Sequence, residues 1–269
     1  MTEHANKPII HFVHGNSFPA GTYRLFLDQL RGQYEVQASD MLGHHPAYPV
    51  DDGWSNLAQE LIDTLVARYQ QPVILLGHSL GGILSLMVAR ARPDLVRGVV
   101  VIDSPIVAGW RALLVRVSKW IGVDKKYGPA RFSEKRKNLW KDRQAAFDHF
   151  AAKEIFAIWP TEVLWDYINA GTVETPDGVT LRFTREVETE VYLSLPHVMG
   201  RLIRRRPRVP IGFVGGTDSV ECAQAGHFYT KKLMVPNYVL IPGGHLIPME
   251  VPLQTASAVL AMLATLQLN

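Results

Sequence analysis

The sequence predicts an α/β protein with a mostly parallel sheet of about six strands flanked by helices. Short β-rich runs recur between helical stretches, and several runs are apolar at consecutive positions, which is typical of strands covered on both faces. The runs stop near Pro105 and resume at Pro210. We therefore expect a core formed by residues 1–104 and 210–269, with a mainly helical lid, residues 105–209, inserted after the fourth strand.

The expected core elements follow the chain in order. A helix between the second and third strands is predicted by Trp54, Leu57 and Leu61, which recur at the spacing of one helix face, and it serves as a crossover. A final helix is predicted around Leu253 and Leu260. The predicted strands are 9–13, 34–38, 73–76, 99–102, 211–214 and 238–241.

The insertion differs in composition, since it holds five of the six tryptophans. Most of it is expected to be helical, but residues 175–183 suggest a turn leading into a small hairpin. Its aromatic side chains have two interpretations, the wall of an apolar pocket or the core of the lid itself. The arginine run between Arg201 and Arg208 also has two, a solvated helix end or a contact with an anion or a membrane.

Composition excludes several classes of function. The net charge of +3 on 269 residues is too small for the electrostatic footprint of a nucleic-acid binder. The single cysteine, Cys222, has no partner for a disulfide or a thiolate metal site. The N-terminus is unlike a signal peptide, and no apolar run approaches the roughly 20 residues of a membrane span. We expect a cytoplasmic protein without a membrane span.

The strongest chemical signal is Gly77-His78-Ser79-Leu80-Gly81-Gly82, which lies between an apolar strand and a helical stretch. This is the context of a nucleophile elbow, in which small neighbours permit the strained backbone of the serine. The following helix directs its N-terminal amides at the same place, so the Leu80 N–H is a natural donor to an oxyanion. We expect Ser79 to be a nucleophile.

A serine nucleophile needs a base and an acid that orients the base. His245 follows the last predicted strand, and Asp218 ends the strand before it, so both are expected at the carboxyl edge of the sheet. Asp218 is the preferred acid. Glu221 and Asp103 compete for this role, and Asp103 also follows a strand end.

The second oxyanion donor is expected in the loop after the first strand, with the backbone N–H of Asn16 as the candidate. Histidines 14, 44, 45 and 78 are expected to hold neighbouring backbone. They lie in three loops without an i, i+4 pair, so no metal site is predicted. The chain also lacks the glycine-rich spacing of a nucleotide site, and we expect no cofactor.

At these residues the chain resembles the α/β-hydrolase superfamily, and within it the lidded bacterial serine hydrolases of the esterase and C–C hydrolase type. The segment Asp40-Met41-Leu42-Gly43-His44 is similar to a loop of that family. The resemblance implies an α/β-hydrolase fold, a catalytic triad of Ser79, His245 and Asp218, and an oxyanion hole of the Asn16 and Leu80 amides. Haloalkane dehalogenases share a similar first loop but have aspartate at the elbow.

We therefore expect a carboxylesterase-like serine hydrolase that cleaves a small apolar ester, or a related acyl substrate, through an acyl-enzyme on Ser79 with His245 as base. Three alternatives stay open: a C–C bond hydrolase, a perhydrolase on the same triad, and a ligand sensor with little turnover. A small-molecule acyl substrate is the expected partner. The chain starts almost at the first strand, which leaves either an exposed sheet edge or a homodimer contact there.

Overall fold

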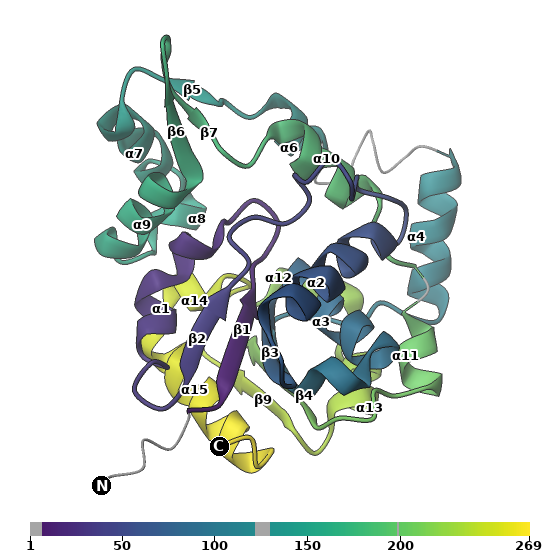
Figure 1. The fold of residues 1–269 in the computed structure, drawn as a ribbon. Helices are drawn as coiled ribbons and strands as arrows, with labels where there is room; N and C mark the ends of the chain where they lie inside the picture. The colour runs from purple at the N-terminus through teal and green to yellow at the C-terminus, as the bar shows by residue number, and fades with distance from the viewer. Residues whose placement is uncertain (1–6, 122–129, 198) are drawn as a thin grey trace, which may run out of the picture.

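A six-stranded sheet forms the centre of the molecule. The computed structural model describes residues 7–121, 130–197 and 199–269. The strand order is β2-β1-β3-β4-β8-β9, and every neighbouring pair is parallel, which confirms the predicted α/β-hydrolase fold class (Figure 1). The strands are β1 (Ile9–Val13), β2 (Glu35–Ala38), β3 (Val73–His78), β4 (Val96–Ile102), β8 (Ile211–Gly216) and β9 (Tyr238–Ile241).

Helices cover both faces of this sheet, as the two-sided apolar strands require. Successive side chains of β3 alternate between two buried clusters: Ile74 and Leu76 belong to one, Val73 and Leu75 to the other. The first cluster includes α1 (Arg24–Asp28) and α15 (Pro252–Thr265), and the second includes α2 (Ser55–Arg68), α3 (Leu80–Ala91) and α13 (His227–Met234). Four short elements complete the core: η1 (Ala20–Tyr23), η2 (Pro93–Leu95), α12 (Val220–Ala225) and α14 (Ile247–Glu250).

Between β4 and β8 the chain forms a helical segment with a small antiparallel sheet of order β5-β7-β6. Strands β6 (Thr172–Thr175) and β7 (Gly178–Leu181) are the expected hairpin, whereas β5 (Leu139–Trp140) has no counterpart in the sequence-based expectation. The helices are α4 (Trp110–Ile121), α6 (Ala130–Lys135), α7 (Arg143–Ala151), α8 (Glu154–Ala157), α9 (Thr161–Gly171), α10 (Arg185–Leu193) and α11 (Gly200–Arg204).

Most of the described aromatic side chains between β4 and β8, the expected lid, pack against one another. Phe150 contacts Trp140, Phe156 and Tyr167 with ring centroids 4.9 to 5.3 Å apart, and all four residues are buried. Offset and edge-to-face pairs at this separation are typical of a stable aromatic core. Of the two interpretations of the lid aromatics, these contacts favour the core of the lid. Trp110 and Trp120 differ, because they are 61% and 86% exposed.

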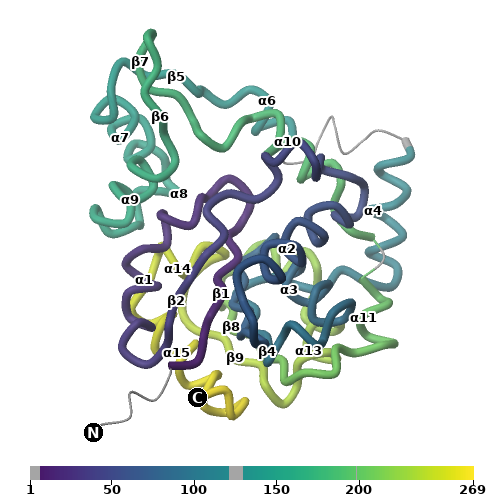
Figure 2. Tube along the Cα trace, in the orientation of Figure 1, coloured from purple at the N-terminus to yellow at the C-terminus, as the bar shows by residue number. Residues whose placement is uncertain are grey.

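Parallel strands bring their carboxyl ends to one edge, so the loops after β1, β3, β4, β8 and β9 meet there. Helix α10 is tied to this edge by two contacts: Asn16 donates to the carbonyl oxygen of Glu188, and the Trp54 indole donates to Ser194. Figure 2 shows the start of β1 and the C-terminus at the opposite end of the molecule from hairpin β6–β7. In the part of the chain that the structure describes, no helix is long and apolar enough to cross a membrane.

Candidate active site

Ser79 occupies a strained turn between β3 and α3. Its backbone angles are φ 52° and ψ −117°, a combination that residues with a side chain rarely adopt. The turn is tight because a Cβ on Gly77 would overlap the carbonyl group of Gly81, and a Cβ on Gly81 would overlap that of Val13. Glycine at both positions lets α3 begin directly against the end of β1, with the Ser79 side chain at the edge of the sheet.

His245 connects this serine to a buried carboxylate. Its Nε2 lies 2.9 Å from the Ser79 hydroxyl, and its Nδ1 lies 2.7 Å from Asp103 Oδ1. The two contacts assign the protons: Nδ1–H donates to the carboxylate, so Nε2 is free to accept from the serine. A serine, a neutral imidazole and a carboxylate are thus joined in one hydrogen-bonded chain.

The Asp103 side chain is fully buried, and its oxygens receive further donors. Ser219 donates to Oδ1 at 2.6 Å, and the Gly216 backbone N–H donates to Oδ2 at 2.7 Å. Burial alone would raise the pKa of this carboxyl group, but the hydrogen bonds from His245, Ser219 and Gly216 hold the pKa below its ordinary value. Asp103 is therefore an anion at neutral pH.

Asp218, the acid preferred on the sequence, is placed elsewhere. It is exposed in the turn after β8, its backbone N–H donates to the Gly243 carbonyl, and the described contacts of His245 do not include its carboxylate. Asp103 directly follows β4, and its buried carboxylate reaches the histidine. Asp218 lies two residues beyond the end of β8 and is exposed.

The candidate oxyanion donors flank the serine. Leu80 is the first residue of α3, and Gly81 packs against the carbonyl groups of Val13 and His14, so the helix start adjoins the loop that carries Asn16. Among the described residues, neither the Leu80 nor the Asn16 backbone N–H has a hydrogen-bond acceptor. Two such amides beside a nucleophile are suited to bind a developing negative charge.

A buried network that the sequence did not predict ties this loop to the histidine. The Tyr23 hydroxyl accepts from the Gly15 backbone N–H at 3.0 Å and donates to His78 Nδ1 at 2.8 Å. His78 Nε2 then donates to the carbonyl oxygen of His245 at 3.0 Å. Burial lowers the pKa of His78 to about 3, which keeps its ring neutral. No sequence pattern points to Tyr23, because its role depends on how η1 folds back on β1.

The other loop histidines hold backbone groups, as expected. His14 Nε2 accepts from the Leu42 N–H at 2.7 Å, and His44 Nε2 accepts from the Thr184 N–H at 3.1 Å. Burial lowers the pKa of His14 to about 4. Within the described ranges there is no group of three or more potential metal ligands.

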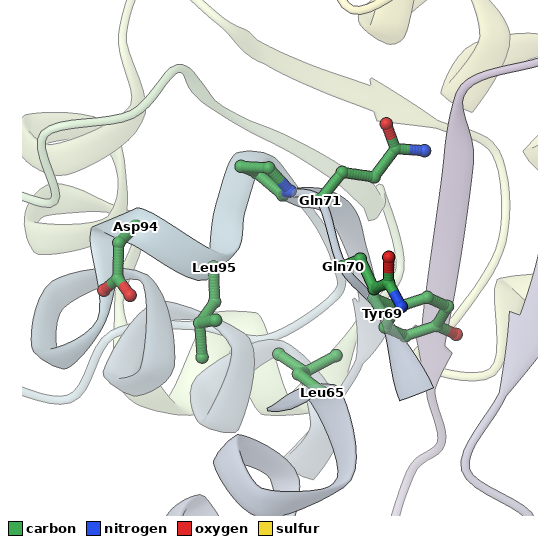
Figure 3. A pocket seen from close by; sticks show the side chains of 7 residues that line it. Leu65, Tyr69, Gln70, Gln71, Asp94 and Leu95 are labelled. Atoms are coloured by element: carbon green, nitrogen blue, oxygen red, sulfur yellow. The ribbon is translucent and has the colours of Figure 1, made fainter. Parts of the chain in front are cut away.

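A small cavity lies away from these residues. It measures about 90 Å³ and is lined by side chains from the end of α2 and from η2, among them Leu65, Tyr69 and Leu95 (Figure 3). These elements meet at the amino end of β3, opposite the edge that carries Ser79. The volume is far below the 300 Å³ or so typical of a ligand pocket.

The charged groups around His245 raise its pKa. Burial opposes the charge on the ring, but the hydrogen bond to Asp103 and the negative charges of Glu221 and Glu250 raise the pKa of His245 above its ordinary value. Since this pKa is higher in the folded than in the unfolded state, protonation of His245 stabilises the fold. That contribution is complete below the unfolded-state pKa and is lost as the pH rises through the folded-state pKa.

Comparisons with known proteins agree with the fold. A model of the alpha/beta hydrolase family matches residues 12–258. A 2-(acetamidomethylene)succinate hydrolase from Mesorhizobium japonicum is 29% identical over 105 residues, which make up 38% of this chain and 38% of that protein. The matched segment thus spans well under half of the curated relative.

Three solved structures cover nearly the whole chain. E-2-(Acetamidomethylene)succinate hydrolase has a TM-score of 0.76 at 20% identity, covering 96% of this chain and 92% of its own. A peroxisomal alpha-beta-hydrolase from Saccharomyces cerevisiae has a TM-score of 0.75 at 16% identity, covering 98% and 78%. The enol-lactonase from Burkholderia xenovorans has a TM-score of 0.64 at 14% identity, covering 97% and 93%. At these identities the likeness shows the fold.

Tyr23→Phe should lower the free energy of unfolding by about 2 kcal/mol, because it leaves the buried Gly15 N–H and His78 Nδ1 without a partner. Urea denaturation measures this. The matched control is Tyr48→Phe, which removes a surface hydroxyl that donates to Asp63. An equal loss in both variants would contradict the role of the buried network.

Glu221→Gln should lower the pKa of His245, because it removes a half-exposed negative charge 3.8 Å from Nδ1. The fall should be less than about one pH unit, since solvent screens the carboxylate. NMR titration of the histidine ring measures it, with the exposed Glu186→Gln as control. An unchanged pKa would show that Glu221 does not act on the ring.

Proposed function

Because the chain belongs to the alpha/beta hydrolase family, we propose that it is a serine hydrolase that cleaves a small carboxylic ester or related acyl substrate through an acyl-enzyme on Ser79. The observation that carries this proposal is the continuous chain of contacts from Ser79 through His245 to Asp103. A strained serine, a neutral imidazole and a buried anion are the parts that nucleophilic acyl transfer needs.

The first half of the reaction forms the acyl-enzyme. The Ser79 hydroxyl attacks the substrate carbonyl while its proton moves to His245 Nε2. Asp103 stays ionised and stabilises the imidazolium that forms. The tetrahedral oxyanion is held by the backbone N–H groups of Leu80 and Asn16. Collapse of this intermediate expels the alcohol, which takes the proton from His245.

The second half releases the acid. Water attacks the acyl group on Ser79 and gives its proton to His245 Nε2, and the same two amides hold the second oxyanion. The new tetrahedral intermediate expels Ser79, which recovers its proton from His245. Against the opposing effect of burial, the hydrogen bond to Asp103 and the charges of Glu221 and Glu250 raise the pKa of His245, which favours the imidazolium that forms in both halves of the cycle.

One of the comparisons supports an ester as the substrate class. The relative named an enol-lactonase acts, by its name, on a lactone, which is a cyclic ester. The aromatic side chains of the expected lid are not evidence that the acyl group is apolar, because most of those described pack against one another.

The test is hydrolysis of a graded series of p-nitrophenyl esters by wild type and by Ser79→Ala, with fluorophosphonate labelling read by intact mass. We expect wild type to turn over many times and to label once. Ser79→Ala should not label, and its kcat should fall on the order of 10⁶-fold. If wild type neither labels nor turns over, Ser79 is not an activated nucleophile, and a ligand sensor becomes the better hypothesis.

The acid is tested by comparing Asp103→Asn with Asp218→Asn. Asp103→Asn should lower kcat by about 10⁴-fold, because an amide stabilises neither the required tautomer nor the imidazolium. Asp218→Asn changes an exposed carboxylate and should alter kcat by no more than about twofold. Thermal unfolding of both variants separates loss of folding from loss of activity. A larger loss of kcat in Asp218→Asn than in Asp103→Asn would assign the role of triad acid to Asp218.

A further inference from the structure

Helix α4 exposes its apolar face. Trp110, Leu113, Leu114, Val117 and Trp120 recur at the spacing of one helical face, and their side chains are between 41% and 86% exposed. A surface helix normally turns this face toward the core. Single exposed apolar residues need no explanation, but a contiguous stripe over three turns marks a contact surface.

The opposite face of α4 holds the helix to the protein. Ala112 is buried, and Lys119, seven residues later on the same face, bonds to Asp52 and to the carbonyl oxygen of Leu195. The Arg111 guanidinium lies against Gly226 and stacks on the Trp110 ring at 4.5 Å. The inward face is thus fixed by polar contacts, and α4 cannot turn its apolar stripe inward without breaking them.

The charged residues of α4 itself have one sign. Its sequence holds Arg111, Arg116 and Lys119 and no acidic residue. Helix α11 begins beside the segment that leads into α4, since Gly200 lies against Ala108, two residues before that helix. It starts the arginine run, whose exposed members are Arg201, Arg204, Arg205, Arg206 and Arg208.

We propose that α4 is an interfacial helix that docks this protein on an anionic lipid bilayer. Trp110 and Trp120, at the two ends of the helix, enter the headgroup region, and Leu113, Leu114 and Val117 lie at the acyl boundary between them. The flanking arginines face the lipid phosphates. Tryptophans at the ends of an apolar stripe and cations at its margins are the chemistry of a peripheral membrane anchor.

Charge also decides against a second copy of the chain as the occupant. A symmetric dimer through this face would set α4 against itself, because a two-fold interface pairs the same patch on both subunits. Arg116, the exposed cation beside the stripe, would then approach its own copy with no acidic residue on either helix. An anionic lipid surface supplies the negative charge that a second copy lacks.

The test is co-sedimentation of the full-length protein with vesicles of phosphatidylcholine alone and of phosphatidylcholine mixed with phosphatidylglycerol. We expect binding to the mixed vesicles that weakens as salt rises, and little binding to the neutral ones. Brominated phosphatidylglycerol should quench the fluorescence of the exposed Trp110 and Trp120, whereas Trp54, Trp140 and Trp159 are buried.

Two leucines of equal exposure give a matched pair. Leu114 on α4 and Leu253 on α15 are each 56% exposed. Leu114→Ser should weaken partitioning onto the mixed vesicles about tenfold, and Leu253→Ser should leave it unchanged. Arg116→Ser should weaken it about fivefold. Hydrolysis of a dissolved p-nitrophenyl ester should be the same in all variants, so that a failure of this proposal is distinct from a failure of the proposed reaction.

Three results would overturn the proposal. The first is no binding to mixed vesicles. The second is equal weakening by Leu114→Ser and Leu253→Ser, which would reflect general surface hydrophobicity. The third is a concentration-dependent dimer in analytical ultracentrifugation that Leu114→Ser abolishes while vesicle binding is absent, which would assign the stripe to a second copy.

Discussion

The close approach of α3 to β1 and β3 is the constraint on which the rest of the site depends. It is possible because neither Gly77 nor Gly81 carries a side chain. Gly77 lies against the carbonyl group of Gly81, and Gly81 lies against that of Val13 at the end of β1. The same approach holds Ser79 in its strained backbone conformation, with positive φ, and sets the first amide of α3 beside the loop that carries Asn16. A single packing requirement therefore positions the proposed nucleophile and a proposed oxyanion donor together. The backbone strain at Ser79 is compensated by the buried packing of β3 before the turn and of α3 after it.

The second constraint is a buried charge. Asp103 is completely removed from solvent, and a carboxylate is costly to bury unless its lone pairs are used. Here they are used by groups from two other segments: Gly216 and Ser219 at the end of β8, and His245 in the loop after β9. The carboxylate at the end of β4 therefore holds these two neighbouring strand ends together as well as contacting the histidine. Ser219 also caps α12 by accepting from Cys222, which links the start of that helix to the same anion.

The sequence predicted what depends on local pattern and missed what depends on spatial order. The strands were predicted because their apolar residues form runs, and the serine and histidine were singled out because glycines surround them in loops after strands. The choice between Asp103 and Asp218 could not be made this way, since both follow strand ends and only the contact of Asp103 with His245 in the folded chain distinguishes them. The same limit applies to α4: its periodicity identifies an apolar face, but the direction of that face is set by the contacts of Lys119 and Arg111.

Helix α10 connects the segment between β4 and β8 to the sheet edge that carries Ser79. Glu188 on α10 accepts from the Asn16 side chain through its carbonyl group, while its carboxylate forms a buried ion pair with Arg136 at 2.6 Å, and Arg136 also donates to Tyr167 in the aromatic core of the lid. Removing either charge would leave the other buried without a partner, so this arrangement resists partial rearrangement. Any movement of α10 must therefore displace the Asn16 side chain or break its hydrogen bond. The geometry of the loop that carries Asn16 is therefore coupled to the position of α10.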